Sequence, residues 1–394
     1  MAEKVPGLSE ARVTRELAFS PDEYQQRQSG VRKQMAVRGI DVLVVSTPEN
    51  MYYLSGFNTP GYYMNQCLML PLNGEPIIVC RGTEEMNVFA TSCLTRSDSY
   101  ADDVPPMVKF ADILKQDGFS HACIGVEKIS WFLTVANFEK LLALLPAARF
   151  VDGSMIVENC RMIKSEAEIA YIRKASQIAC AGMRAAYDVI RVGATEDDVA
   201  AEVNRVTTAM GGEWPGLPPF VCSGVRTSFT HATYAGRRLE KGDPVLLELP
   251  GVTKRYAGAL MRTVFVEGNG AKQIQEMYDV SRRALEAHLK FIRPGRTPGQ
   301  VWEQWAKTLA EANYPDTYRR AGYSIGINYP PDWGEGYIIG FQRGENRPLE
   351  PNMTFHVPSL VKHFGLANVG CSETIRVTSS GCEVLTEFED SLQM

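Results

Sequence analysis

The arrangement of apolar and polar residues divides the chain into two parts with different secondary-structure patterns. The first part begins with a polar, arginine-rich helical pattern over residues 19–38, in which Ser20 is a cap residue. Short apolar runs bounded by turn-forming residues then predict strands at residues 41–45, 67–70, 76–79 and 122–126. The first part is therefore predicted to be an α/β domain with a mixed or parallel sheet.

The pattern changes to long helices between residues 150 and 161. Ser165 is followed three positions later by Glu168, and apolar residues then recur at helical spacing as far as Ile190. A serine with a glutamate three positions on forms the capping box that begins a helix. We place a domain boundary near residue 160, which gives domains of residues 1–160 and 161–394.

The second part contains an internal repeat. Residues 190–195 (Ile-Arg-Val-Gly-Ala-Thr) correspond to residues 292–297 (Ile-Arg-Pro-Gly-Arg-Thr), and both segments end a long helix at a glycine and begin the next at a threonine cap. Pairs of strand-like runs follow the two copies, at residues 245–249 with 259–266 and at residues 353–357 with 373–378. The repeat predicts a duplicated helix–helix–strand unit with pseudo-twofold symmetry.

Composition and charge narrow the class of protein. Hydrophobic residues make up 45% of the 394-residue chain, which is enough for packed cores. The net charge of −5, without a basic block, argues against nucleic acid as a partner. The N-terminus lacks the apolar core of a secretory signal, and no apolar run approaches the roughly 20 residues of a membrane span. We expect a cytoplasmic protein that binds a small molecule and has no nucleic-acid or membrane partner.

The cysteines give no evidence of a disulfide framework. The nine cysteines are scattered and form no Cys-x-x-Cys pair. Such a pair would be expected in a thiolate metal site, and an even count in a disulfide scaffold. We expect most of the cysteines to be buried in a reducing compartment.

The candidate chemistry begins with Glu248, a lone carboxylate in the apolar run at residues 245–249. A carboxylate taken out of water must find partners or become protonated. Near a pocket, the same penalty makes it a tunable base or nucleophile. Pairing with Arg255 or Arg262 in the hairpin is the structural alternative, and from this segment alone we weigh the two interpretations equally.

The linker at residues 161–168 (Arg-Met-Ile-Lys-Ser-Glu-Ala-Glu), the repeat and the N-terminal pattern together resemble the creatinase and methionine/Xaa-Pro aminopeptidase superfamily, which has the pita-bread fold. The resemblance covers nearly the whole chain. It implies an α/β (α+β) fold, in which a creatinase-like α/β domain precedes a pseudo-twofold pita-bread catalytic domain. Peptidases of this superfamily bind two metal ions through two Asp, one His and two Glu residues.

The metal-ligand positions identified by this resemblance are changed in this chain. They carry, in order, Glu248, Ala259, Tyr323, Pro358 or Val357, and Ser372, with Glu373 as the alternative if the last register slips by one residue. At most two carboxylates of five ligands remain, whereas two divalent ions require several converging oxygen or nitrogen ligands. We predict a site with no metal and no cofactor. His356 and His363 form a less favoured pair of metal ligands, because their seven-residue spacing spans a Pro-Ser turn.

A metal-free subgroup is more similar still. Residues 321–335, which include Tyr-Ser-Ile-Gly and Pro-Pro-Asp-Trp-Gly-Glu, and residues 371–374 (Cys-Ser-Glu-Thr) resemble ectoine hydrolases of this superfamily. That resemblance implies hydrolysis of a C–N bond in a small zwitterionic cyclic amidine, with ectoine opened to N-acetyl-diaminobutyrate as the leading reaction. The alternatives are a creatinase-like amidinohydrolase, an Xaa-Pro metallopeptidase and an inactive binding protein. Met261 replaces creatinase's second-strand carboxylate, which argues against creatine.

The resemblance also implies roles for individual residues. Glu248 is the expected nucleophile or general base, and His231, at the position of creatinase's catalytic histidine, is the expected proton shuttle. Tyr323 is expected to donate a hydrogen bond to developing charge, and Glu373 to be a second carboxylate. Substrate contacts are expected from Asp332, Trp333, Glu335, Tyr62 and Tyr63.

Structural interpretations compete with several of these roles. His231 is otherwise an exposed loop residue, Tyr323 a buried side chain packed on Ile325, and the acidic residues of the 332–335 loop are turn or cap formers. In creatinase-type members the N-terminal domain reaches over the partner subunit's pocket. We therefore expect a homodimer in which the loop at residues 56–63 covers the partner's site, with an ordinary connection between strands as the alternative.

Overall fold

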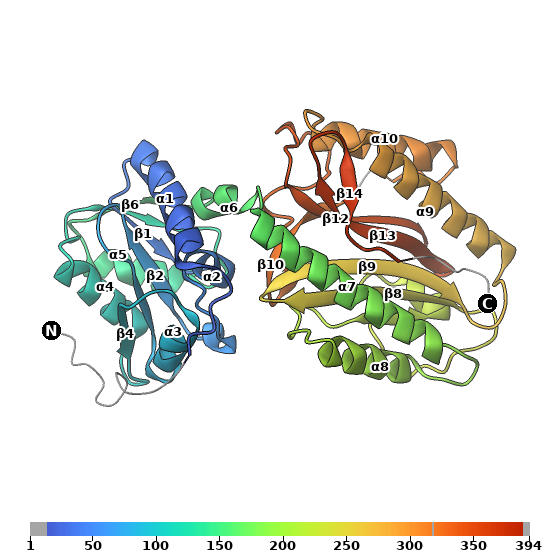
Figure 1. Cartoon of the computed structure of the whole chain (residues 1–394), viewed down its shortest axis with the longest axis horizontal. Coiled ribbons are helices and arrows are strands. Elements are labelled where there is room, and N and C mark those ends of the chain that lie inside the picture. Colours follow the sequence, from blue (N-terminus) through green and yellow to red (C-terminus); the bar gives the residue numbers. More distant parts are fainter. Residues whose placement is uncertain (1–13, 317–318, 389–394) are drawn as a thin grey trace. The chain divides into compact units, whose positions relative to one another are not determined.

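The computed structural model describes residues 14–316 and 319–388. The chain forms two compact units, Met1–Arg161 and Met162–Met394 (Figure 1). The division falls one residue beyond the boundary placed from the change in sequence pattern.

The first unit is built on a six-stranded sheet in the order β4-β3-β2-β1-β5-β6. The sheet is mixed, because β2 runs antiparallel to both β1 and β3 while the remaining pairs are parallel. The strands are β1 (Val42–Val45), β2 (Cys67–Pro71), β3 (Ile77–Arg81), β4 (Ser97–Tyr100), β5 (Cys123–Val126) and β6 (Arg149–Asp152). All four predicted strand runs form strands.

The helices of the first unit are α1 (Pro21–Arg38), α2 (Pro48–Ser55), α3 (Glu85–Thr91), α4 (Pro106–Gln116), α5 (Val135–Leu144) and α6 (Ile156–Arg161), with short 3₁₀ turns at η2 (Pro60–Tyr63) and η3 (Gly82–Glu84). Ser20 caps α1 as predicted, because its side chain accepts the backbone N–H of Glu23. Apolar side chains of α4 and α5 pack on the buried residues of the sheet and form the core of this unit.

The second unit contains an eight-stranded sheet in the order β14-β13-β12-β10-β9-β8-β7, with β11 paired to β10. Its strands are β7 (Phe220–Ser223), β8 (Pro244–Thr253), β9 (Tyr256–Phe265), β10 (Tyr323–Tyr329), β11 (Asp332–Gly334), β12 (Thr354–His363), β13 (Ala367–Val377) and β14 (Cys382–Val384). Its helices are α7 (Glu166–Val189), α8 (Glu196–Ala209), α9 (Lys272–Phe291) and α10 (Pro298–Glu311), and η4 (Gly224–Ser228) follows β7.

The second unit repeats one plan twice. Helices α7 and α8 pack together beside the β8–β9 hairpin, and α9 and α10 pack together beside the β12–β13 hairpin (Figure 1). The predicted capping boxes are present at Ser165 and Thr297, where each side chain accepts the backbone N–H of the third helical residue. The predicted α/β fold with a duplicated C-terminal unit is confirmed.

Two glycines allow α7 to approach the strand hairpin closely. A Cβ atom at Gly251 would lie 2.0 Å from the carbonyl oxygen of Ala175, and one at Gly258 would lie 2.5 Å from the Ser176 hydroxyl oxygen. Because the backbones meet at this distance only where side chains are absent, the two glycines fix the position of β8 and β9 against α7. This contact therefore fixes the position of β8, the strand that carries Glu248.

The cysteines form no disulfide bonds. All nine cysteines are free thiols, and six of them are buried. Among residues 14–316 and 319–388, none of the helices has the length and apolar character that a membrane crossing requires.

Candidate active site

A cavity of about 170 Å³ lies in the second unit, lined by β7, β8, β12 and the loop that follows η4. Strands β9 and β10 also contribute to its lining. The side chains that bear on the chemistry are Glu248, His231, Tyr323, Met261 and Pro358. The structure therefore brings together three of the four predicted catalytic residues.

Glu248 lies in β8, and its side chain is 18% exposed. Burial, and to a smaller extent the charge of Asp332, raises the pKa of this carboxyl to about 7. The structural alternative fails for both arginines: Arg262 pairs with Glu373, and Arg255 donates to the backbone oxygens of Asn328 and Trp214. Glu248 is thus a carboxylate poised to gain or lose a proton near neutral pH.

Tyr323 is at the centre of a chain of hydrogen bonds behind the cavity. Its hydroxyl accepts the indole N–H of Trp333 at 2.9 Å and lies 2.8 Å from Nδ1 of His356. Nε2 of His356 lies 2.6 Å from the hydroxyl oxygen of Ser372, which also accepts the backbone N–H of Met261 at 2.7 Å. The carboxylate of Glu248 is nearby, with Oε1 3.9 Å from Nδ1 of His356.

Burial controls the protonation of the side chains in this hydrogen-bond network. It lowers the pKa of His356 to about 3, so the imidazole is neutral at physiological pH. Burial, together with the charge of Glu248, raises the pKa of Tyr323 well above its ordinary value. The phenol therefore remains protonated and able to donate a hydrogen bond.

The register of β12 and β13 decides between Ser372 and Glu373. Ser372 pairs with Pro358, which lines the cavity, whereas Glu373 pairs with Val357 and has the opposite orientation. Glu373 accepts a hydrogen bond from Arg262 at 2.6 Å. Its predicted role as a second catalytic carboxylate is corrected to a structural ion pair, because a one-residue shift along a strand reverses the face on which a side chain lies.

In the loop at residues 332–335, two side chains act on groups of the site and a third is enclosed within the fold. Trp333 is 2% exposed and donates to the Tyr323 hydroxyl, while Asp332 acts through its charge on Glu248. Glu335 is fully enclosed: it pairs with Lys164 at 2.8 Å and accepts the backbone N–H of Ile327 at 3.0 Å. The predicted substrate contact of Glu335 is therefore corrected to a structural role, because both of its oxygens are engaged inside the fold.

His231 lies in the loop after η4, at the edge of the cavity. Its ring stacks on Phe220 with centroids 5.6 Å apart, and its backbone is left-handed at φ 58°. Non-glycine residues adopt this conformation rarely, and such residues are concentrated at functional sites.

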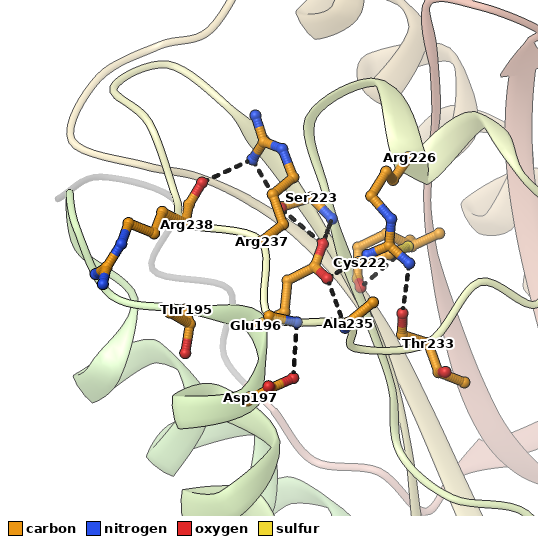
Figure 2. A network of polar contacts seen from close by, with 12 residues as sticks. Thr195, Glu196, Asp197, Cys222, Ser223, Arg226, Thr233, Ala235, Arg237 and Arg238 are labelled. Carbon is orange, nitrogen blue, oxygen red and sulfur yellow. Dashed lines mark hydrogen bonds and ion pairs between the residues drawn. The ribbon is translucent and has the colours of Figure 1, made fainter.

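A buried carboxylate anchors both ends of the His231 loop (Figure 2). Glu196 accepts the backbone N–H and hydroxyl of Ser223, both at 2.8 Å, and the backbone N–H of Ala235 at 3.0 Å. It also pairs with Arg226, which donates to the backbone oxygen of Thr233 at 2.9 Å. Sequence reasoning did not single out Glu196, because an acidic residue in the first turn of a helix already has an explanation in the helix dipole.

Three cationic side chains that sequence reasoning did not single out line the cavity: Arg319, Arg320 and Lys362. Arg319 pairs with Asp316. Arg320 donates to the backbone oxygen of Gly336 at 2.7 Å and Lys362 to the hydroxyl of Thr230; neither forms an ion pair with a carboxylate among the described residues, although the charge of Arg320 acts on Asp332. The cavity therefore offers two positive charges to an anion.

Tyr62 and Tyr63 lie in η2 of the first unit. Tyr62 packs edge-on against Phe132, with ring centroids 5.6 Å apart. Tyr63 is 73% exposed, which leaves its ring available to a ligand or another chain.

The donor set does not fit a two-metal site. Ala259 and Pro358 have no side-chain ligand atoms, and within residues 14–316 and 319–388 no three His, Cys, Asp or Glu side chains are grouped to hold a metal ion. The alternative histidine pair is not formed either, because His356 is buried against Tyr323 and Ser372 while His363 is exposed.

Comparisons with known proteins identify the families that the two units match. Residues 170–379 match the family model "Metallopeptidase family M24", and residues 27–163 match "Creatinase/Prolidase N-terminal domain". The chain is 32% identical to the ectoine hydrolase of Halomonas elongata, over 95% of this chain and 98% of the relative. It is also 32% identical to an uncharacterized hydrolase/peptidase of Sinorhizobium fredii, over 94% of this chain and 96% of the relative.

Solved structures share the fold at lower identity. The prolidase of Pyrococcus horikoshii OT3 superposes with a TM-score of 0.82 at 21% identity, covering 93% of this chain and 100% of the prolidase. The Xaa-Pro dipeptidase of Bacillus anthracis gives the same TM-score of 0.82 and 21% identity, over 94% and 99% of the two chains.

Proposed function

The chain belongs to metallopeptidase family M24 and carries a creatinase/prolidase N-terminal domain, and from this membership and its cavity we propose that it is a metal-independent hydrolase. Its proposed substrate is a small zwitterionic cyclic amidine, with ectoine as the leading candidate. The observation that carries the proposal is a single carboxylate, Glu248, facing a small cavity that Pro358 also lines, while Ala259 in β9 and Pro358 stand at the positions of metal ligands in the family's peptidases.

The proposed reaction adds one water molecule across a C–N bond of the ring. As a general base, Glu248 takes a proton from water while the water oxygen bonds to the amidine carbon. The ring C–N bond then breaks, the departing nitrogen takes a proton through His231, and the carbon becomes the carbonyl of an acetamide. As a nucleophile, Glu248 would instead bond to the carbon first, while the ring C–N bond breaks and the departing nitrogen takes a proton through His231; water would then add to the carbon, break its bond to Glu248 and leave the acetamide. In both routes Tyr323 donates to the water-derived oxygen in the step in which it bonds to the carbon.

The charges lining the cavity match a zwitterion. An amidinium would pair with Glu248, helped by the negative charge of Asp332. A carboxylate would be held by Lys362 and Arg320, which form no ion pair with a carboxylate among the described residues. The cavity of about 170 Å³ is smaller than the roughly 300 to 1,000 Å³ usual for drug-sized ligands, which favours a small substrate over a peptide.

The test combines two measurements on the purified protein. Incubation with ectoine, followed by mass spectrometry, is expected to give N-acetyl-diaminobutyrate, and metal analysis is expected to find no stoichiometric metal. A chelator is expected to leave the rate unchanged. Stoichiometric Mn, Co or Zn with chelator-sensitive cleavage of Xaa-Pro dipeptides would overturn the proposal.

The assembly is part of the same proposal. We expect a homodimer, in the reducing environment of the cytoplasm, in which the loop with Tyr62 and Tyr63 covers the partner's cavity. The exposed ring of Tyr63 supports this arrangement. Light scattering after gel filtration tests the dimer, and Tyr63→Ala is expected to raise KM while the oligomeric state stays the same.

A further inference from the structure

The hydrogen bonds around Tyr323 form one continuous chain whose directions follow from the supply of donors and acceptors. At one end, the backbone N–H of Met261 donates to Ser372, and at the other end the indole N–H of Trp333 donates to Tyr323. Both groups are donors only. The hydroxyl oxygens of Ser372 and Tyr323 therefore each accept one bond before His356 is considered.

His356 joins the two hydroxyls, with Nδ1 on Tyr323 and Nε2 on Ser372. A neutral imidazole carries one N–H and one acceptor nitrogen, so two tautomers are available. The choice between them determines the direction of the Tyr323 O–H group.

The Nε2–H tautomer leaves one donor without a partner. Nε2–H would donate to Ser372, whose oxygen would then accept two bonds, and the Ser372 O–H would have no acceptor among the described residues. Ser372 is fully buried, so bulk water does not reach its hydroxyl. An unsatisfied buried donor is destabilising, which disfavours this tautomer. In this tautomer the Tyr323 O–H donates to Nδ1 and points away from the cavity.

The Nδ1–H tautomer satisfies Ser372 and His356 and leaves only the Tyr323 O–H, which borders the cavity, without an acceptor among the described residues. The Ser372 O–H donates to Nε2, and Nδ1–H donates to the Tyr323 oxygen, which also accepts from Trp333. With both neighbours donating to it, the Tyr323 hydroxyl has its own proton left for the cavity that the phenol lines together with Glu248.

We propose that Ser372, His356 and Trp333 are positioning residues that hold the Tyr323 O–H as a hydrogen-bond donor directed into the cavity. The donor would hydrogen-bond the water-derived oxygen that bonds to the amidine carbon beside Glu248. The catalytic role of this donor rests on the proposed hydrolase function. The direction of the hydrogen bonds is independent of that function.

The tautomer of His356 tests the direction without any substrate. Nitrogen-15 NMR of the full-length protein labelled at histidine distinguishes Nδ1–H from Nε2–H, and a His356→Asn variant identifies the resonances. We expect the Nδ1–H tautomer between pH 6 and pH 8. In Ser372→Ala the donor to Nε2 is absent, so the population is expected to shift towards Nε2–H. Finding Nε2–H in the unmodified protein would overturn the proposal, whether or not the protein hydrolyses ectoine.

Kinetics test the consequence for catalysis. Tyr323→Phe is expected to lower kcat by roughly 100-fold with little change in KM, as for the loss of one donor to a developing oxyanion. Ser372→Ala is expected to lower kcat by about tenfold, which corresponds to one misdirected hydrogen bond, and Ser372→Thr to restore most of it.

A matched control is available in Ser281, a buried serine whose hydroxyl donates to the backbone oxygen of Ser359 at 2.7 Å. Ser281→Ala removes a hydroxyl of the same kind outside the Tyr323 chain. We expect it to lower stability with kcat unchanged. If Ser372→Ala affects only stability in the same way, Ser372 is a structural residue and the proposal fails. If the unmodified protein does not turn over ectoine, the substrate assignment fails while the NMR result still decides the tautomer.

Discussion

The two strand hairpins of the duplicated unit differ in where they carry charge. In β8–β9 the acid Glu248 lines the cavity, and no arginine or lysine pairs with it in the described part of the chain. In β12–β13 the acid Glu373 has the opposite orientation and pairs with Arg262, while the neutral His356 lies behind Tyr323. The difference leaves one ionisable carboxylate supported by neutral hydrogen-bonding groups, which suits attack on a carbon centre better than it suits metal binding.

The largest effect is expected from removing the charge in the first hairpin. Glu248→Gln keeps the size of the side chain but abolishes its basicity and nucleophilicity, so kcat for ectoine hydrolysis is expected to fall by roughly 10³-fold or more. Product formation followed by mass spectrometry measures this. A variant that retains more than a tenth of the activity would show that the carboxylate is not the reacting group.

The same variant is expected to be more stable, and the gain depends on pH. Burial raises the pKa of Glu248 from 4.5 to about 7, so between these pH values the folded protein holds a proton that the unfolded chain has released. The free energy of unfolding therefore falls as pH rises through this window.

Glutamine does not ionise, so the variant does not bear the cost of a buried negative charge. The stabilising effect of Glu248→Gln is expected to grow from pH 5 to pH 8, approaching roughly 3 kcal/mol. Denaturant unfolding of both proteins at the two pH values measures the difference. An equal effect at pH 5 and pH 8 would mean that folding does not raise the pKa of Glu248.

In the second hairpin, Glu373→Gln should affect stability. The ion pair with Arg262 has side chains that are 4% and 12% exposed, and removing one partner leaves a nearly buried arginine without its counter-charge. We expect a loss of roughly 2 kcal/mol, read by thermal unfolding. A loss of kcat comparable with that of Glu248→Gln would instead restore Glu373 to the active site and remove the contrast between the hairpins.

The smallest effect is expected at the anchor of the His231 loop. Glu196→Gln weakens the bonds to Ser223, Ala235 and Arg226, so kcat/KM is expected to fall by about tenfold. Hydrogen exchange over residues 224–237 should become faster at the same time. The matched control is Asp197→Asn, an exposed neighbour that, among the residues the structure describes, accepts the backbone N–H of Gly236 alone, at 3.0 Å. Equal effects in the two variants would contradict the anchoring role.

Local rules predicted the elements of the fold. The caps at Ser20, Ser165 and Thr297 depend on neighbouring residues alone, and they were readable because a cap side chain bonds to its own helix. The repeat and its two strand hairpins were also predictable, because the same local pattern occurs twice.

The site was less accessible to sequence reasoning, because its geometry depends on distant partners. The sequence placed Glu248 and Tyr323 in the cavity through the family register. It could not place Glu335, whose partner Lys164 is 171 positions away along the chain. Nor could it choose between Ser372 and Glu373, since a one-residue slip in register reverses which of them lies on the same face of the sheet as the cavity-lining Pro358.

The left-handed backbone of His231 has a consequence for how its side chain should be studied. Alanine tolerates φ 58° poorly, so His231→Ala would change the loop as well as remove the imidazole. Asparagine is among the residues most often found in this conformation, so it removes the imidazole with less disturbance of the loop. A scan that uses alanine at this position would therefore assign to proton transfer a loss of rate that belongs partly to the shape of the main chain.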